Sequence, residues 1–129
     1  LPISLAVRSV NLQDRSHIFS VRPRVLIDNE ASKLHTVIEV NARDRIGLLY
    51  DLTLVFSSLE LQISSSHITT YGERAVDVFY VKDSFGLKIT HQRKLKKLRD
   101  ILHKAASKNE KKIINYYFQF ISNFIALNA

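Results

Sequence analysis

The chain has 129 residues, of which 46% are hydrophobic, and a net charge of +7. This length suits one small domain, and the absence of cysteine excludes disulfides and thiolate chemistry and is consistent with a reducing compartment. No apolar run approaches the roughly 20 residues that a membrane-spanning helix requires.

The first segment, residues 1–20, is largely polar and has no sustained hydrophobic period. We expect it to be a linker from a preceding unit. Because the chain starts without Met and without a signal-peptide pattern, we also expect it to be a piece of a longer protein.

Two strands around a polar turn are predicted next. Residues 21–27 are apolar and β-branched, and Pro23 restricts this strand to a sheet edge or a strand start. Residues 36–40 alternate in polarity, so they predict a second strand that forms a hairpin with the first. The second strand carries Ile38 and Val40 on one face and Val37, Glu39 and Asn41 on the other.

Residues 41–49 (NARDRIGLL) join this strand to a helix predicted over 48–59. Asp44 is a suitable cap for the helix, whose first N–H groups are unpaired and carry partial positive charge. Gly47 lets a small ligand approach the backbone closely. The joint therefore predicts a site for a small anion or an amino acid; the alternative is a helix cap with two solvated arginines.

Strands over 61–71 and 75–82 and a helix over 90–106, with Thr90 as its cap, are predicted to follow. The order ββαββα predicts an α+β, ferredoxin-like fold: an antiparallel four-stranded sheet with two helices on one face. That fold normally ends with a strand beside the first one. Here the strand over 21–27 can supply that edge, so residues 21–106 are expected to form the domain.

The C-terminal extension, residues 107–129, fits two patterns. Ile113, Tyr117 and Phe124 follow a helical stripe, whereas Ile114, Tyr116 and Phe118 alternate like a strand. Its length favours a helix. So many aromatic residues require cover from the domain or from a partner.

Residues with catalytic or metal-binding potential form no known motif. No two of the five histidines (His17, His35, His67, His91 and His103) have the spacing of a zinc pair, and no nucleophile elbow, phosphate loop or dinucleotide fingerprint is present.

Asp77 is predicted on the solvent face of its strand, or as a contact for a basic group such as Arg74. Glu39 and Asn41 lead into the joint and either line the same site or lie on an open sheet face. A small domain of this kind is a weak enzyme candidate.

Much of the positive charge lies late in the chain. It indicates either the solvated face of a helix or a surface for nucleic acid. The solvated face is favoured because the lysines interleave with an apolar stripe and lack aromatic companions. The residues concerned are Arg93, Lys94, Lys96, Lys97, Arg99, Lys104, Lys108, Lys111 and Lys112.

The string over 41–49, followed by Asp51 and Leu52, resembles the signature of ACT domains, small ferredoxin-like modules that bind amino acids and regulate an attached enzyme. Within that family, the strings PRVLIDN, HTVIEV and HITTYGERAVDVFYVKD are most similar to the C-terminal ACT domains of bifunctional PII uridylyltransferase/uridylyl-removing enzymes. The resemblance covers about residues 20–105. It departs from the family at Ile46, where proline is common, and after residue 106.

The resemblance implies a glutamine-sensing module of a cytoplasmic enzyme of nitrogen regulation, which attaches uridylyl groups to PII and removes them. It implies that this region holds no cofactor, and that Mg²⁺ and the nucleotidyltransferase and phosphohydrolase activities belong to upstream domains. It also implies self-association through ACT pairing, with neither a membrane nor nucleic acid as a partner. Family ligands lie where the joint of one ACT unit meets the strand after the first helix of another. The implied ligand-binding residues are Asn41, Asp44, Arg45, Ile46, Gly47, Leu48, Gln62, Ile63 and Ser64.

Overall fold

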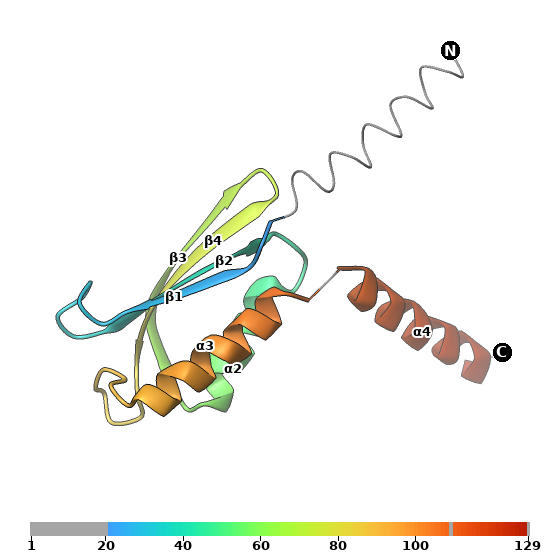
Figure 1. The fold of residues 1–129 in the computed structure, drawn as a ribbon. Coiled ribbons are helices and arrows are strands. Elements are labelled where there is room, and N and C mark those ends of the chain that lie inside the picture. The colour runs from blue at the N-terminus through green and yellow to red at the C-terminus, as the bar shows by residue number, and fades with distance from the viewer. Residues whose placement is uncertain (1–20, 109, 129) are drawn as a thin grey trace, which may run out of the picture.

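A four-stranded antiparallel sheet with strand order β1-β2-β4-β3 forms the centre of the computed structural model (Figure 1). The structure describes residues 21–108 and 110–128, so the predicted linker over 1–20, with His17, lies outside the described residues. The strands are β1 (Arg24–Asp28), β2 (Thr36–Arg43), β3 (Gln62–Tyr71) and β4 (Arg74–Lys82). The helices are α2 (Leu48–Ser58), α3 (Gln92–Ala106) and α4 (Glu110–Asn128).

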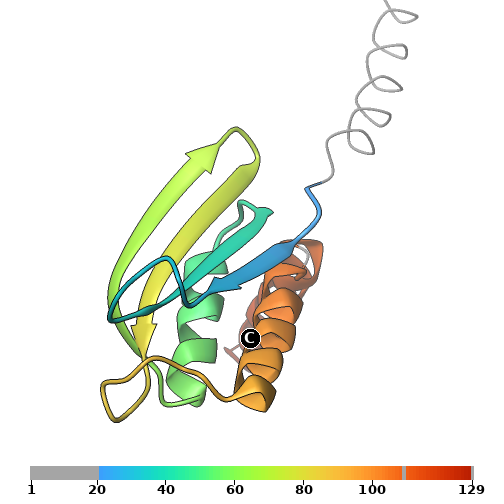
Figure 2. The same cartoon turned by 60° about the vertical axis from the view of Figure 1, so that its left-hand side comes forward.

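The predicted ferredoxin-like arrangement is confirmed, including the unusual source of its edge strand. β1 and β2 form an antiparallel hairpin in which Leu26 lies opposite Glu39, so β1 occupies the edge beside β2. β4 pairs with the other side of β2, and β3 forms the opposite edge. Helices α2 and α3 lie together on one face of the sheet (Figure 2).

The core fills the space between this face and the two helices. Strand β2 buries alternate residues, including Ile38 and Val40, as its pattern predicts. The rings of Phe56 on α2 and Phe79 on β4 have centroids 4.9 Å apart and form the aromatic centre of the core. All the buried apolar side chains of the described residues lie between Val25 and Ala106, so the core is complete without α4.

The predicted position of Asp77 on the solvent face is wrong. In β4, the side chains of Ala75, Asp77, Phe79 and Val81 are buried, while those of Val76, Val78 and Tyr80 lie on the open face. Both alternating sets of this strand are apolar enough to form a core, so alternation alone could not choose between them. The register decides: Phe79 lies opposite Ile38 on the helix-covered face, and Asp77 follows it there.

The two predicted helix caps are also wrong. The residue at the N-terminal cap of α2 is Gly47, because the chain needs three more residues after Asp44 to turn from β2 into the helix. The cap of α3 is His91 instead of Thr90. In both helices, no side-chain oxygen caps the first turn within the described residues.

A buried polar network joins the β1–β2 turn to the loop before α3. The hydroxyl of Thr36, which is fully buried, donates to Asn29 Oδ1 at 2.6 Å and accepts from the N–H of Ile89 at 2.9 Å. Asn29 Nδ2 in turn donates to the carbonyl of Ile89 at 2.8 Å. The network satisfies the polar groups at this end of the core.

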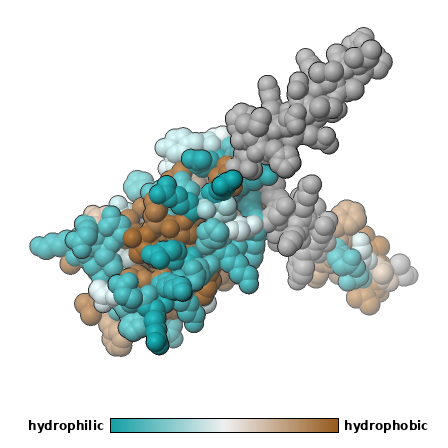
Figure 3. Space-filling model, in the orientation of Figure 1, coloured by the Kyte–Doolittle hydropathy of each residue, from teal (hydrophilic) through white to brown (hydrophobic). Residues whose placement is uncertain are grey.

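Helix α4 confirms the helical interpretation of the C-terminal extension. It contacts none of the other described helices and strands, and Figure 1 shows it standing apart from them. The brown residues on its end in Figure 3 are exposed apolar side chains. The side chains of residues 110–117, including Ile113 and Tyr117, lie outside the described part, as do those of Lys111 and Lys112. The exposed apolar residues are Phe118, Phe120, Ile121, Phe124, Ile125 and Leu127. No helix within 21–108 and 110–128 has the length and apolar character needed to cross a bilayer.

Candidate functional site

A hollow of about 270 Å³ lies where the loop after β2 and the first turn of α2 face strands β3 and β4. The loop and the helix contribute one wall, and the last residues of β3 and the first of β4 contribute the other. The lining residues are Asp44, Arg45, Gly47, Leu48, Leu49, Tyr50, Ile68, Thr70, Ala75 and Asp77.

Gly47 shapes the wall formed by the helix. Its φ of +82° lies in the left-handed region that side chains rarely adopt, so this turn into α2 favours glycine. The turn directs the start of α2, with its partial positive charge, to the border of the hollow. The N–H of Leu48 donates to the carbonyl of Arg45 at 3.3 Å, which leaves the N–H groups of Leu49 and Tyr50 as the unpaired ones of the first turn within the described residues. This wall is therefore suited to an anionic group such as a carboxylate.

Asp77 gives the strand wall the opposite charge. Its side chain is 2% exposed, and its Oδ1 atom has no hydrogen-bond partner among the described residues. Burial, and to a smaller extent the negative charge of Asp44, raises the pKa of Asp77 to about 6. Above that pH the hollow borders a buried negative charge.

Arg45 contacts the interior of the domain. Its Nη2 atom donates to Asp51 Oδ2 at 2.7 Å and to the carbonyl of Ala105 at 3.0 Å, and Nη1 donates to the carbonyl of Ile46 at 3.1 Å. The guanidinium group therefore ties the loop to α2 and to the last turn of α3. The Arg45 side chain is 2% exposed, so it borders the hollow while its charge is paired with Asp51.

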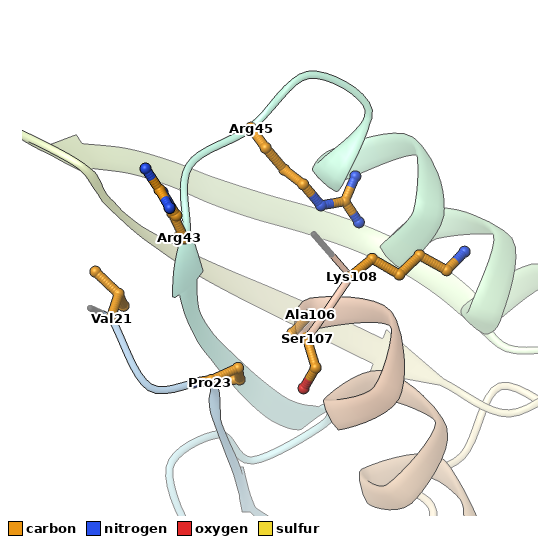
Figure 4. A pocket seen from close by; sticks show the side chains of 7 residues that line it. All are labelled: Val21, Pro23, Arg43, Arg45, Ala106, Ser107 and Lys108. Atoms are coloured by element: carbon orange, nitrogen blue, oxygen red, sulfur yellow. The ribbon is translucent and has the colours of Figure 1, made fainter. Parts of the chain in front are cut away.

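A second pocket, of about 220 Å³, lies on another side of Arg45 (Figure 4). Figure 4 shows the Arg45 and Lys108 side chains extending in the same direction, and Nζ of Lys108 lies 3.8 Å from Asp51. The pocket has three cationic side chains, and two of them, Arg45 and Lys108, therefore lie beside the same carboxylate, that of Asp51. The lining residues are Val21, Pro23, Arg43, Arg45, Ala106, Ser107 and Lys108.

The structure brings four of the nine predicted site residues to one place: Asp44, Arg45, Gly47 and Leu48 line the hollow. Ile46 is 86% exposed and does not line it. Asn41 lies on the open face of the sheet, where its Nδ2 donates to Glu39 at 2.6 Å. The open-face interpretation of Glu39 and Asn41 is therefore the one that the structure supports.

The other three predicted residues, Gln62, Ile63 and Ser64, lie at the far end of β3 from the hollow. All three are exposed, and Gln62 and Ile63 pair with Lys82 and Val81 at the end of β4, while Ser64 lies at a break in the register. The hollow borders β4 at Ala75 and Asp77 instead. Within one chain, the predicted residues of the loop and those of β3 therefore do not form a common site. That they meet between two ACT units stays a prediction.

Sequence reasoning missed the wall formed by Ile68, Thr70 and Asp77. Asp77 carried a signal, because it shares its alternating set with Ala75, Phe79 and Val81, and a carboxylate in such a set is either solvent-exposed or functional. Ile68 and Thr70 carried none, since β3 is exposed along its whole length. Among the described residues, no three histidine or acidic side chains lie close enough together to hold a metal ion.

Comparisons with known proteins identify relatives of this fold. Residues 24–116 match the family described as "ACR9-like, ACT-like domain". The chain is 60% identical over 103 residues to the bifunctional uridylyltransferase/uridylyl-removing enzyme of Azospirillum brasilense, covering 79% of this chain and 11% of that one. It is 50% identical over 107 residues to the enzyme of the same name from Rhodospirillum rubrum, covering 81% and 11%.

The chain thus spans about a tenth of the length of these relatives. Among solved structures, a crystal structure of an unknown protein from Galdieria sulphuraria is similar, with a TM-score of 0.45 and 17% sequence identity. The matched region covers 55% of this chain and 37% of the chain from Galdieria sulphuraria.

Proposed function

Since the chain belongs to the family of ACT-like domains, we propose that it is a regulatory module that binds an amino acid, and that this amino acid is glutamine. The observation that carries the proposal is the uncapped N-terminus of α2, which borders a hollow beside Gly47. The ligand carboxylate accepts hydrogen bonds from unpaired N–H groups at the turn into α2, and the acidic side of the hollow receives its ammonium group.

The site is completed by a second ACT unit, either another copy of this chain or a tandem neighbour. In support, the amide-bearing residues that suit the glutamine side chain, Asn41 and Gln62, lie away from the hollow in one chain. Gln62, Ile63 and Ser64 lie exposed on the edge strand β3, which a second unit can approach.

In the whole protein, the module regulates a cytoplasmic enzyme that attaches uridylyl groups to PII and removes them, with Mg²⁺ in its catalytic domains. The 50–60% identity to enzymes with the corresponding name supports this assignment. Regulation requires that glutamine binds two states of that enzyme with different affinity.

Nucleic-acid binding by the open sheet face is less favoured. Such a face stacks bases on neighbouring aromatic residues. In β2 and β4 only Tyr80 offers an aromatic ring there, because Phe79 is buried in the core.

Titration calorimetry with glutamine tests the proposal. A Gly47→Val substitution strains the turn into α2 and is expected to weaken glutamine binding at least tenfold. The matched control is Gly86→Val, since Gly86 also has a positive φ, of +78°, but lies in an exposed turn away from the hollow. It is expected to keep the affinity of the unmodified chain. No binding heat from millimolar glutamine in a verified dimer, with oligonucleotide binding that weakens steeply with salt, would contradict the proposal.

A further inference from the structure

The surroundings of Asp77 make its negative charge costly. It lies in the middle of β4, and its register partners on both sides, Val40 and Ile68, are apolar. Its side chain is 98% buried, and Oδ1 has no hydrogen-bond partner among the described residues. A buried carboxylate in this position is stabilised by a cationic partner and destabilised without one.

The charged groups around the hollow do not supply that partner. Asp44, on the loop, is a second acid, and its charge opposes that of Asp77. Arg45, the one cationic side chain in the lining, is hydrogen-bonded to Asp51 and Ala105. The remaining polar side chains of the lining are the hydroxyl groups of Tyr50 on α2 and Thr70 on β3, which supply no cation.

The two walls have opposite polarity. The α2 wall presents N–H groups that favour an anion, and the β4 wall presents the carboxylate of Asp77. An α-amino acid carries a carboxylate and an ammonium group two bonds apart, so it matches both walls at once. A hollow of about 270 Å³ is near the lower end of the usual range for ligand pockets, about 300–1,000 Å³, which suits a ligand of this size.

We infer that the carboxylate of Asp77 accepts the hydrogen bonds of the ligand's primary ammonium group, and that the hollow is thereby selective for ligands with a free amine. This inference rests on the proposed function in so far as the ligand is an amino acid. It assigns the ammonium group to Asp77, with Asp44 at the more exposed side of the hollow.

The direct test is an NMR titration of the Asp77 side-chain carboxyl carbon in the full chain, assigned by its loss in Asp77→Asn. Saturating glutamine is expected to lower the titration midpoint of Asp77 by at least one pH unit, because a bound ammonium group favours the ionised carboxylate. N-acetylglutamine, which lacks the ammonium group, is expected to leave the midpoint unchanged. An equal fall with 5 mM Mg²⁺ alone would overturn the inference in favour of a general cation site.

Calorimetry of variants separates this inference from the proposed function. Asp77→Asn is expected to weaken glutamine binding at least tenfold, while Asp100→Asn, the same change at an exposed position on α3, is expected to leave it unchanged. Equal glutamine affinity in Asp77→Asn and the unmodified chain would overturn the inference and leave the proposed function standing. If glutamine does not bind but another amino acid lowers the Asp77 midpoint, the inference stands and glutamine is the wrong ligand. If no amino acid lowers the midpoint, the inference is wrong.

Discussion

Asp77 binds its proton more tightly in the folded chain than in the unfolded chain, because folding buries its carboxyl beside the charge of Asp44. Between pH 4 and 6 the folded state therefore holds more protons than the unfolded state, and the free energy of unfolding falls as the pH rises through this window. Above about pH 6 the penalty for burying the charge is complete. Below pH 4 it is absent.

We therefore expect Asp77→Asn to stabilise the ligand-free chain at pH 7 by about 1–3 kcal/mol and to have a smaller effect at pH 4. Urea unfolding of both proteins between pH 4 and 8 measures the difference, which should grow up to pH 6 and then stay constant. Asp100→Asn, at an exposed position on α3, should follow the unmodified chain at every pH. Parallel curves for Asp77→Asn and the unmodified chain would show that the carboxyl is not perturbed by folding.

The elements of this fold depend on a few buried polar contacts as well as on the apolar core. The hydroxyl of Thr36 joins the β1–β2 turn to the loop before α3 through Asn29 and Ile89. Replacing it with a methyl group leaves the N–H of Ile89 buried without an acceptor. This contact links the β1–β2 hairpin to the loop before α3 at one end of the core.

Thr36→Val is expected to lower the free energy of unfolding by about 1–3 kcal/mol, although valine has nearly the same shape as threonine. Thr69→Val makes the same replacement on the exposed strand β3 and is expected to change stability by less than about 0.5 kcal/mol. Denaturant unfolding of the two variants side by side measures the cost of the buried contact. A loss of equal size in both would assign it to the strand environment.

The sequence was sufficient to predict the elements that have one clear apolar face. The alternation of β2 and the stripe of α2 each identified a buried face, and Pro23 directed the first strand to an edge, which the structure confirms. β4 was ambiguous because both of its faces are apolar, so the burial of Asp77 required the β2 register. Only one wall of the hollow could be predicted from the sequence. The loop wall is formed by residues that are neighbours in the chain, whereas the strand wall depends on how β3 pairs with β4.

At the scale of the molecule, the described residues form a complete sheet-and-helix core and a helix, α4, that contacts no element of that core. Every buried apolar side chain of the described residues precedes α4, and α4 contacts no other described element. Its exposed phenylalanine side chains, Phe118, Phe120 and Phe124, form an apolar surface of the kind that promotes association. Stability and self-association are therefore expected to depend on different parts of the chain.

A chain truncated after Lys108 is expected to unfold with a free energy within about 0.5 kcal/mol of that of the full chain. Sedimentation velocity at micromolar concentration should show less self-association in the truncated chain, because the exposed phenylalanine side chains of α4 are gone. A loss of several kcal/mol on truncation would show that α4 packs on the core in solution.

The β1–β2 hairpin also bears on how quickly the domain folds. When the edge strand follows the last helix, a ferredoxin-like sheet must pair the two ends of the domain, and such distant contacts slow folding. Here β1 pairs with β2 after a short turn, and β3 pairs with β4 in the same way, so β2 with β4 is the one long-range strand pairing among the described residues. All four strands also precede α3 in the chain, so no strand pairing depends on residues that follow the last helix of the core. The sheet is therefore expected to fold faster than a ferredoxin-like sheet whose edge strand comes from the C-terminal end of the domain.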